Sequence, residues 1–175
     1  YADDNLNKAA HTYMEELIAR HVSGRLKVAP EHTENNVLKM MRKPSFELFE
    51  QFKKIFDRVN KQHGLNQQLI PYFISSHPGC TEADMANLAI QTKKLHFQLE
   101  QVQDFTPTPM TLATEMYYTG YHPYTLEKVY TARTKEQKLA QRQFFFWYKP
   151  EFRRQITQAL QRIGKKDLIG KLFGR

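Results

Sequence analysis

An apolar strand that runs into a capped helix is the feature of this sequence that most limits its fold. Leu69–Ser75 reads LIPYFIS, which predicts a largely buried strand, and a short turn at His77–Gly79 follows it. Thr81 and Asp84 then have the spacing of a capping box, which opens a helix. A strand that leads into a helix through so short a connection is typical of the βα units of parallel sheets.

The same order of elements is found on both sides of this unit. Further strands are predicted at Arg25–Ala29 and, from the alternation of apolar and polar residues, at Phe97–Phe105. Three strands cannot close a barrel, so we expect an α/β fold in which residues 1–119 form part of a larger parallel sheet. The flanking helices are predicted at Asp3–His21, Thr33–Met41, Ser45–Gly64, from Thr81 onward, and in a stretch that ends at Tyr118.

A second region, residues 120–175, is expected to form a helical extension. Helices are predicted to begin at Thr134 and at Pro150, and Gly164 ends the second one. The formal net charge of the chain is +8, and the residues from 133 onward hold 12 of its 26 basic side chains but only 3 of its 18 acidic ones. The charge balance therefore changes close to the predicted boundary, which indicates a separate role for the extension.

Two interpretations of the extension are open. Its cations and the aromatic run Phe144–Tyr148 could bind RNA, with cations on phosphates and rings stacked on bases. Alternatively, the aromatic side chains form an apolar seam against the α/β unit, and the cations are a solvated face. The structural interpretation is favoured, because at least part of a continuous aromatic run must be buried.

Composition excludes several classes of protein. Apolar residues make up 41% of the chain, which is enough for a packed core. No apolar run reaches the roughly 18 residues of a membrane span, and the first residues lack the layout of a signal peptide, so a cytoplasmic protein without a membrane partner is expected. Cys80 is the single cysteine, which excludes an internal disulfide and any metal centre that needs several thiolates from this chain.

Three polar loops follow the three predicted strands. They are Pro30–Glu34, Ser75–Gly79 and Thr106–Met110. In parallel α/β folds the carboxyl ends of the strands meet at one edge, and ligands bind beyond that edge. Turn and capping chemistry explains any one of these loops alone, whereas three of them on the same edge predict a binding site.

Other chemistry in these loops has less support. His32 and His77, with Glu31 and Glu34, are residue types that bind metals, but they lie in separate loops without the spacing of ligands on one helix, so no metal ligand is predicted. Adjacent residues of a strand point in opposite directions, which disfavours Ser76 and His77 as a nucleophile and its base. A lone cysteine near a helix start is more often inert than reactive.

Several segments resemble the second half of the barrel of a radical S-adenosylmethionine (SAM) enzyme. They read VLKMMR at residues 37–42, ISSHPGCTEADM at residues 74–85 and FTPTPMT at residues 105–111. These are similar to segments after the fourth, fifth and sixth strands in the methylthiotransferase-like branch. Together with ALQRIGKKDLIG at residues 159–170, they resemble the YgiQ family, and the similarity runs from about Arg25 to Gly170.

This resemblance implies a partial (βα)6 barrel that binds SAM and a 4Fe-4S cluster and cleaves SAM reductively to begin radical chemistry. Such barrels hold the cluster with a CxxxCxxC motif on their first loop, and this chain has no such motif. The resemblance therefore implies the C-terminal part of a longer enzyme, inactive without its missing N-terminal part. It does not indicate the substrate.

The resemblance also assigns SAM-binding positions. Polar groups after the fourth strand contact the ribose or the amino-acid portion, a cation in the next helix holds the carboxylate, and the two later loops meet the adenine. The matching residues here are Glu31, His32, Glu34 and Arg42 for the first two roles, and Ser75, Ser76, His77, Pro78, Phe105, Thr106 and Pro107 for the third. Ser76 and His77 stand where relatives often have Gly-Phe, and Met110 where they have Gly.

Overall fold

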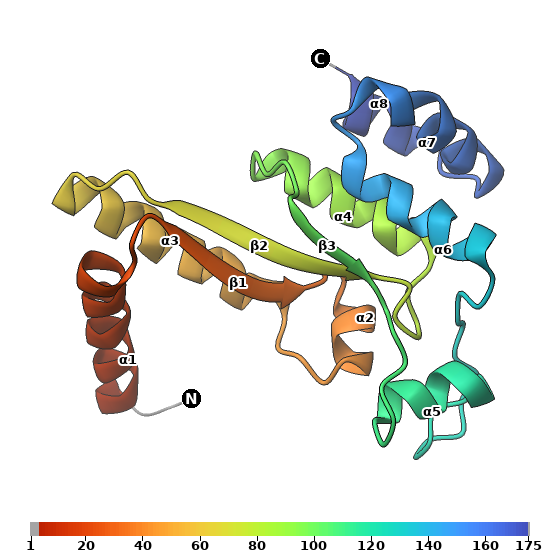
Figure 1. The fold of residues 1–175 in the computed structure, drawn as a ribbon, viewed down its shortest axis with the longest axis horizontal. Helices are drawn as coiled ribbons and strands as arrows, with labels where there is room; N and C mark the ends of the chain where they lie inside the picture. Colours follow the sequence, from red (N-terminus) through yellow and green to blue (C-terminus); the bar gives the residue numbers. More distant parts are fainter. Residues whose placement is uncertain (1–3, 175) are drawn as a thin grey trace.

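The computed structural model describes residues 4–174 and has an open, three-stranded parallel sheet at its centre (Figure 1). The strands are β1 (Arg25–Glu31), β2 (Gln68–Ser75) and β3 (Gln101–Asp104), and β2 lies between the other two. This arrangement confirms the predicted α/β fold with three parallel strands and a helical C-terminal part. It also brings the carboxyl ends of the three strands to one edge.

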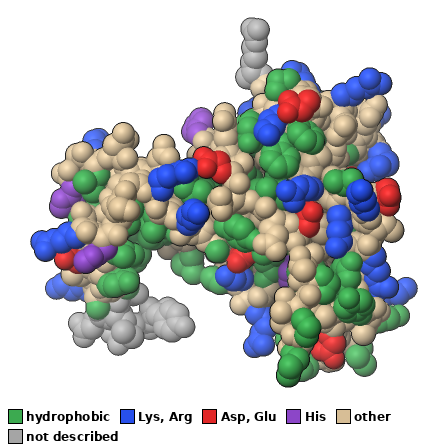
Figure 2. Space-filling view, in the orientation of Figure 1, with side chains coloured by type: hydrophobic (Ala, Val, Ile, Leu, Met, Phe, Trp, Pro, Cys, Tyr) green, Lys and Arg blue, Asp and Glu red, His purple; other side chains and the backbone are tan. Residues whose placement is uncertain are grey.

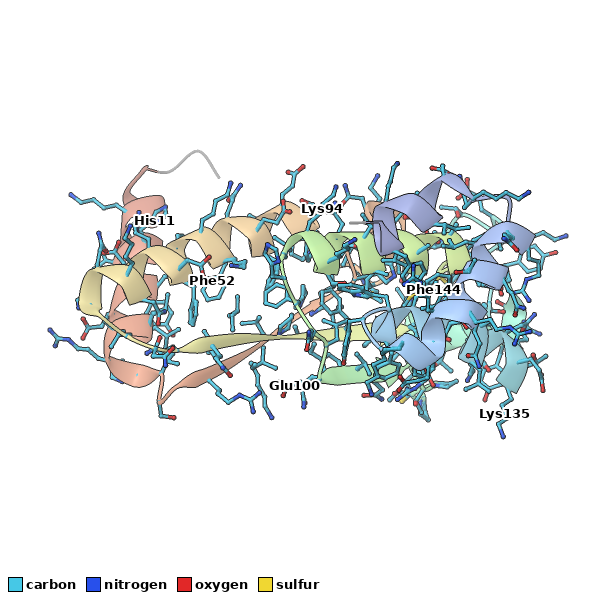
Figure 3. All side chains as sticks on the ribbon, turned by 90° about the horizontal axis from the view of Figure 1, so that it is seen from above. His11, Phe52, Lys94, Glu100, Lys135 and Phe144 are labelled. Carbon is cyan, nitrogen blue, oxygen red and sulfur yellow. The ribbon has the colours of Figure 1, made fainter. Side chains whose placement is uncertain are left out.

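Helices alternate with the strands and then continue through the extension. In Figure 3, α3 and α4 lie along the same side of the sheet. The helices before and between the strands are α1 (Asp4–Glu16), its π-helical continuation η1 (Leu17–His21), α2 (Asn35–Met40), α3 (Phe46–His63) and α4 (Glu82–Lys94). Those that follow the sheet are α5 (Leu112–Thr119), α6 (Lys135–Arg142), the 3₁₀ turn η2 (Gln143–Phe146), α7 (Pro150–Arg162) and α8 (Asp167–Phe173). The predicted first residue of α1, Asp3, lies outside the described residues.

The ends of α3 follow from its sequence. The Ser45 hydroxyl accepts a hydrogen bond from Glu47 N and begins the helix, and Gly64, in the left-handed conformation, ends it. Aromatic residues on one face of α3 bury that face against the sheet. The Phe46 ring, for example, lies 6.4 Å from the Phe73 ring of β2, measured between centroids.

The third strand is shorter than the alternation of residues predicts. The sequence favours Phe97–Phe105, whereas the paired strand is β3, because Phe97 and Leu99 lie in the connection that leaves α4. The Phe97 ring packs on Phe49 with 6.0 Å between centroids, and Leu99 is buried. Core contacts at alternate residues thus produce a strand-like pattern in a segment that precedes the hydrogen-bonded strand.

The extension packs on α4 and shares the core of the sheet. Phe144 and Phe145 of η2 are fully buried, in the same apolar cluster as Phe73 of β2. Trp147 Nε1 donates a hydrogen bond to Thr92 Oγ1 of α4 at 3.2 Å. These contacts form the apolar seam that the structural interpretation expects. The tightening of α6 into η2 and the last helix, α8, have no counterpart in the sequence-based prediction.

On the face of the molecule drawn in Figure 2, basic side chains of the extension are dispersed. Figure 2 shows the Lys and Arg side chains in this part of the molecule interspersed with acidic and apolar ones. Within residues 4–174, no helix combines the length and the hydropathy that crossing a membrane requires.

Candidate functional site

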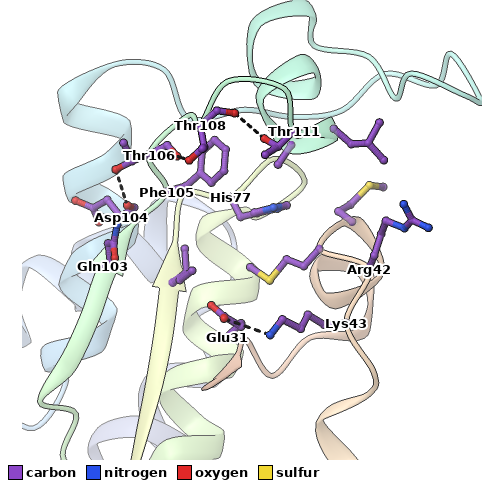
Figure 4. Close-up of a pocket in the computed structure, with 15 residues that line it drawn as sticks. Glu31, Arg42, Lys43, His77, Gln103, Asp104, Phe105, Thr106, Thr108 and Thr111 are labelled. Carbon is purple, nitrogen blue, oxygen red and sulfur yellow. Dashed lines mark hydrogen bonds and ion pairs between the residues drawn. The ribbon is translucent and has the colours of Figure 1, made fainter. Parts of the chain in front are cut away.

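A cavity of about 490 Å³ lies at the carboxyl edge of the sheet (Figure 4). All three predicted loops contribute to it, together with the end of α2 and the start of α5. Its volume is within the roughly 300–1,000 Å³ of small-molecule sites. The polar lining residues are Glu31, Arg42, Lys43, His77, Gln103, Asp104, Thr106, Thr108 and Thr111, and the apolar ones are Met40, Met41, Ile74, Phe105, Leu112 and Ala113.

Glu31 ends β1 and places a carboxylate in the cavity. The register between β1 and β2 shifts between Val28 and Glu31, and Glu31 has a left-handed backbone with φ of 67°. Such an irregularity redirects a side chain at the end of a strand. Glu31 Oε1 lies 3.4 Å from Lys43 Nζ, whereas Oε2 is buried without a hydrogen-bond partner. A buried oxygen of this kind favours a ligand that donates a hydroxyl or amino hydrogen.

The end of α2 brings two cations to the cavity. Lys43 N donates to Leu38 O at 2.9 Å and Arg42 N donates to Lys39 O at 3.0 Å, the two hydrogen bonds of a Schellman motif. Glycine usually occupies the left-handed position of this motif, whereas here it is Arg42, with φ of 56°. The chain therefore tolerates backbone strain at a position that also supplies a guanidinium group.

His77 contributes a neutral imidazole from the turn between β2 and α4. Its Nδ1 lies 2.9 Å from Pro78 O, and because a carbonyl oxygen can only accept, Nδ1 carries the hydrogen and Nε2 is left as an acceptor. Burial lowers the pKa of His77, which keeps the ring neutral. The ring meets Phe105 edge-on, with 5.1 Å between centroids.

The β2–α4 turn that presents His77 has two left-handed residues. Gly79 has φ of 87°, and a Cβ at this position would lie 3.0 Å from Cγ of Met40, which lines the cavity. Ser76 has φ of 62°, and its buried hydroxyl oxygen has no hydrogen-bond partner. A substitution at Gly79 would therefore disturb both the turn and the cavity wall.

Asp104 forms the third wall and is held by two partners. Ser75 Oγ donates to Asp104 Oδ1 at 2.6 Å, and Arg142 Nη1 lies 3.2 Å from Oδ2. Phe105 N also donates to Ser75 O at 2.8 Å, one residue beyond the strand. Because both carboxylate oxygens are engaged, Asp104 serves as a fixed anchor between the ends of β2 and β3.

His32 and Cys80 form a buried pair outside the cavity. Glu34 N donates to His32 Nδ1 at 3.1 Å, which leaves the hydrogen on Nε2, 3.5 Å from Cys80 Sγ. Burial lowers the pKa of His32 to about 3 and raises the pKa of Cys80 far above its usual range. The imidazole and the thiol are therefore both neutral near pH 7, and the thiol is inert.

The cavity gathers five of the eleven residues that the resemblance assigns. The five that line it are Glu31, Arg42, His77, Phe105 and Thr106. The six that do not line it are His32, Glu34, Ser75, Ser76, Pro78 and Pro107. Most of this second group is buried in the packing around the site, while the Glu34 carboxylate accepts a hydrogen bond from Asn87 of α4 at 3.0 Å.

Several lining residues are absent from the sequence-based assignment, notably Lys43, Gln103 and Asp104. For Asp104 a signal exists, because it is an acidic residue at the carboxyl end of a predicted strand. For Lys43 none exists, because its direction depends on the turn that ends α2. A hydrophobic or polar pattern along the chain does not specify that turn when arginine replaces the expected glycine.

A larger cavity of about 760 Å³ lies between α4 and α8. Of the three loops that follow the strands only the first contributes to it, through Glu34, and part of its polar lining is already engaged in packing. Lys93 Nζ donates to the carbonyl oxygens of Lys171 and Leu172 at the end of α8, at 3.1 and 2.8 Å. We therefore place the functional site in the smaller cavity, where side chains from all three strand ends converge.

These features define an α/β protein whose open parallel sheet has a small-molecule-sized cavity at its carboxyl edge. Residues 100–173 match a family described as "Domain of unknown function (DUF3362)". The chain is 68% identical over 175 residues to a "UPF0313 protein" of Porphyromonas gingivalis and 67% identical over 173 residues to one of Bacteroides thetaiotaomicron. It is 45% identical over 163 residues to the "UPF0313 protein YgiQ" of Escherichia coli. The chain belongs to this UPF0313 family of YgiQ-type proteins.

The relatives are much longer than this chain. The alignment with the Porphyromonas gingivalis protein covers 100% of the chain but 28% of that relative, and the one with the Bacteroides thetaiotaomicron protein covers 99% and 28%. The alignment with the Escherichia coli protein covers 90% of the chain and 22% of the relative. The 175 residues thus correspond to about a quarter of a YgiQ-type protein.

Proposed function

We propose that this chain is the SAM-binding half of a radical SAM enzyme in a longer YgiQ-type protein, and that SAM binds in the cavity of about 490 Å³. The observation that carries the proposal is the convergence of the loops after β1, β2 and β3 on this one cavity. Ligand sites of parallel α/β folds lie at this edge.

The lining side chains are chemically suited to the parts of SAM. The cations Arg42 and Lys43 complement a carboxylate. The unpartnered Oε2 of Glu31 can accept from ribose hydroxyls, and Nε2 of His77 can accept from an adenine amino group. Phe105 offers an apolar surface beside the imidazole of His77 for the purine. In this proposal the chain orients SAM and keeps water from it.

The residues of this chain do not fit the ligand set of a 4Fe-4S cluster. Cys80 is fully buried, and its raised pKa opposes formation of the thiolate that ligates iron. Within residues 4–174, no three His, Cys, Asp or Glu side chains are grouped as a metal site. The proposal therefore assigns the cluster ligands to the rest of the longer protein, where the cluster would supply the electron that cleaves SAM.

The test uses the full-length protein, reconstituted with iron and sulfide, and measures SAM binding and the formation of 5′-deoxyadenosine under a strong reductant. Lys43→Ala is expected to weaken SAM binding about tenfold, the value of one charge-assisted hydrogen bond. Lys39→Ala, at an exposed position of α2 just before the turn that holds Lys43, is the matched control and should bind as the wild type does. Absence of SAM binding and of 5′-deoxyadenosine in the reconstituted wild type would refute the proposal.

The geometry gives RNA binding by the extension less support, and that function stays a prediction. Phe144 and Phe145 are fully buried, so neither ring can stack on a base. Several cations also have partners within the protein: Arg162 bonds both carboxylate oxygens of Glu82, and Arg153 lies over the Phe173 ring. These contacts favour a structural role for the extension.

A further inference from the structure

The cavity depends on more than the sheet and its own helices, because α6 of the extension reaches two of the three loops around it. The residues involved are consecutive, Gln141 and Arg142. Gln141 contacts the turn after β2, and Arg142 contacts the end of β3. Neither residue lines the cavity, so each can act on it only through the loop that it holds.

Gln141 is fully buried, and the backbone of the β2–α4 turn uses both ends of its amide. Its Oε1 accepts a hydrogen bond from Ser76 N at 2.7 Å, and its Nε2 donates to Cys80 O at 2.7 Å. These bonds bracket His77–Gly79, the part of the turn that brings an imidazole to the cavity. One side chain of the extension thereby fixes both ends of the turn.

The loop that precedes α6 makes a third hydrogen bond to the backbone of the same turn. Gly79 N donates to Tyr130 O at 2.8 Å. Nearby, Arg142 Nη1 lies 3.2 Å from Oδ2 of Asp104, whose other oxygen accepts from Ser75 Oγ. The extension therefore satisfies polar groups on the ends of both β2 and β3.

The turn needs this support because of its own backbone. Ser76 is held at φ of 62°, a conformation that a non-glycine residue adopts reluctantly, and its N–H is buried. Without Gln141, the Ser76 N–H and the Cys80 carbonyl would both lack the partners that they have here, and a buried unpaired group favours rearrangement of the segment that contains it.

We propose that Gln141 is a positioning residue: it holds Ser76–Cys80 in the conformation that places His77 in the cavity, so that binding there depends on a docked α6. The effect on SAM rests on the function proposed above, whereas the effect on the turn does not. The extension is thus part of the site rather than a separate appendage.

The test compares Gln141→Met with Gln143→Met in the full-length protein. Gln143 is a matched control, since it is partly buried and its Nε2 donates to Ala140 O of its own helical segment at 2.9 Å. In Gln141→Met, amide hydrogen exchange in residues 74–81 should rise at least tenfold, with β1 and α3 unchanged, and the Kd for SAM should rise at least tenfold. The control should change neither quantity.

A second variant, Gln141→Glu, supplies a readout that a merely structural role would not move. A protonated carboxyl can donate to Cys80 O and accept from Ser76 N–H, whereas a carboxylate can only accept. Protection of the turn in this variant should therefore be close to that of the wild type at low pH and fall as the introduced carboxyl ionises.

Wild-type protection of residues 74–81 in Gln141→Met would overturn the inference, and so would a uniform loss of protection across the chain. If the turn loosens as expected but the wild type does not bind SAM, the positioning role stands and the assignment of SAM fails.

Discussion

Left-handed backbones at residues other than glycine gather around the cavity. Among residues 4–174 there are six, and four of them lie at the loops around the site: Glu31, Arg42, Ser76 and Met110. Such a conformation costs a side-chain-bearing residue roughly 1–2 kcal/mol relative to glycine. Strain concentrated in this way is typical of sites in which the side chain contributes more to function than to stability.

Arg42 permits a direct test of this interpretation. Arg42→Gly relieves the left-handed strain, so the free energy of unfolding should stay the same or rise by up to about 1 kcal/mol. The variant also removes a cation from the cavity, so the affinity for SAM should fall roughly tenfold. Urea denaturation and a SAM titration of the full-length protein measure the two effects.

His96→Gly is the control for Arg42→Gly. His96 occupies the equivalent position after α4, with φ of 59° and hydrogen bonds of the same pattern. It does not line the proposed site. The two variants should therefore have similar stabilities and differ in SAM affinity. Equal loss of affinity in both, or none in Arg42→Gly, would contradict the role assigned to Arg42.

The burial of His32 predicts a defined pH dependence of stability. Its pKa is about 3 in the folded chain, against an ordinary value of 6.5 when unfolded. Between these values the unfolded state binds the additional proton, so His32 should lower the free energy of unfolding by about 1.4 kcal/mol for each pH unit below 6.5. Above pH 6.5 His32 is neutral in both states, and this loss of stability is absent.

His32→Asn should abolish this pH-dependent loss of stability while keeping an acceptor for Glu34 N. The stability difference between wild type and variant, measured by urea denaturation, should be largest at pH 8 and shrink toward pH 4.5. His77, whose pKa is also lowered by burial, is present in both proteins, so its own titration contributes to both stability curves. A difference that stays constant over this range would show that His32 titrates alike in the folded and unfolded states.

At the residue scale, the sequence predicts the loops of the site better than the side chains that enter it. Glu31 lines the cavity and lies at a register shift in β1. Ser76 does not line it, and its backbone is left-handed, with φ of 62°. A one-dimensional pattern of apolar and polar residues contains neither feature, because each depends on a distant segment: β2 for the register of Glu31, and α6 for the backbone of Ser76. Residue types at strand ends were therefore predictable, and their directions were not.

At the element scale, local signals determine where helices begin. Thr81 and Asp84 form the predicted capping box: Thr81 Oγ1 accepts from Asp84 N at 3.3 Å, and Asp84 Oδ2 accepts from Thr81 N at 2.8 Å. These contacts involve residues three apart, so the sequence alone specifies them. The extent of β3 depends instead on its neighbour β2, which is why alternation in residues 97–105 predicts too long a strand.

Thr81→Ala measures the contribution of this helix start. Loss of the cap should lower the free energy of unfolding by about 1 kcal/mol, within the usual range of roughly 0.5–2 kcal/mol. Thr12→Ala is a suitable control, because the Thr12 hydroxyl lies on the exposed surface of α1 and bonds Lys8 O within the helix. The control should stay within about 0.5 kcal/mol of the wild type in urea denaturation. If the two substitutions lowered the free energy of unfolding equally, the stabilisation assigned to the Thr81 cap would be contradicted.

At the scale of the whole molecule, the charge distribution suggests two parts of the chain, whereas the packing of the core joins them. The change in charge near residue 133 suggests a boundary there. The buried cluster crosses this boundary, since it includes Phe73 and Leu88 on one side and Phe144 and Ile156 on the other. Surface charge reflects the solvent and possible partners, whereas the continuity of the core determines which segments unfold together.

Phe144→Ala tests whether the extension and the sheet unfold as one unit. Truncation of this fully buried ring should lower the free energy of unfolding of the 175-residue chain by about 3–5 kcal/mol. Trp147, the single tryptophan, reports on the extension through its fluorescence, and far-ultraviolet circular dichroism reports on the whole chain. The fluorescence and dichroism transitions in urea should coincide in wild type and variant and should shift together.

Leu139→Ala, at a side chain that is 52% exposed, is the control. It should change the free energy of unfolding from either probe by no more than about 0.5 kcal/mol. A fluorescence transition that precedes the dichroism transition in Phe144→Ala would show that the extension detaches from an intact sheet, contrary to the shared core.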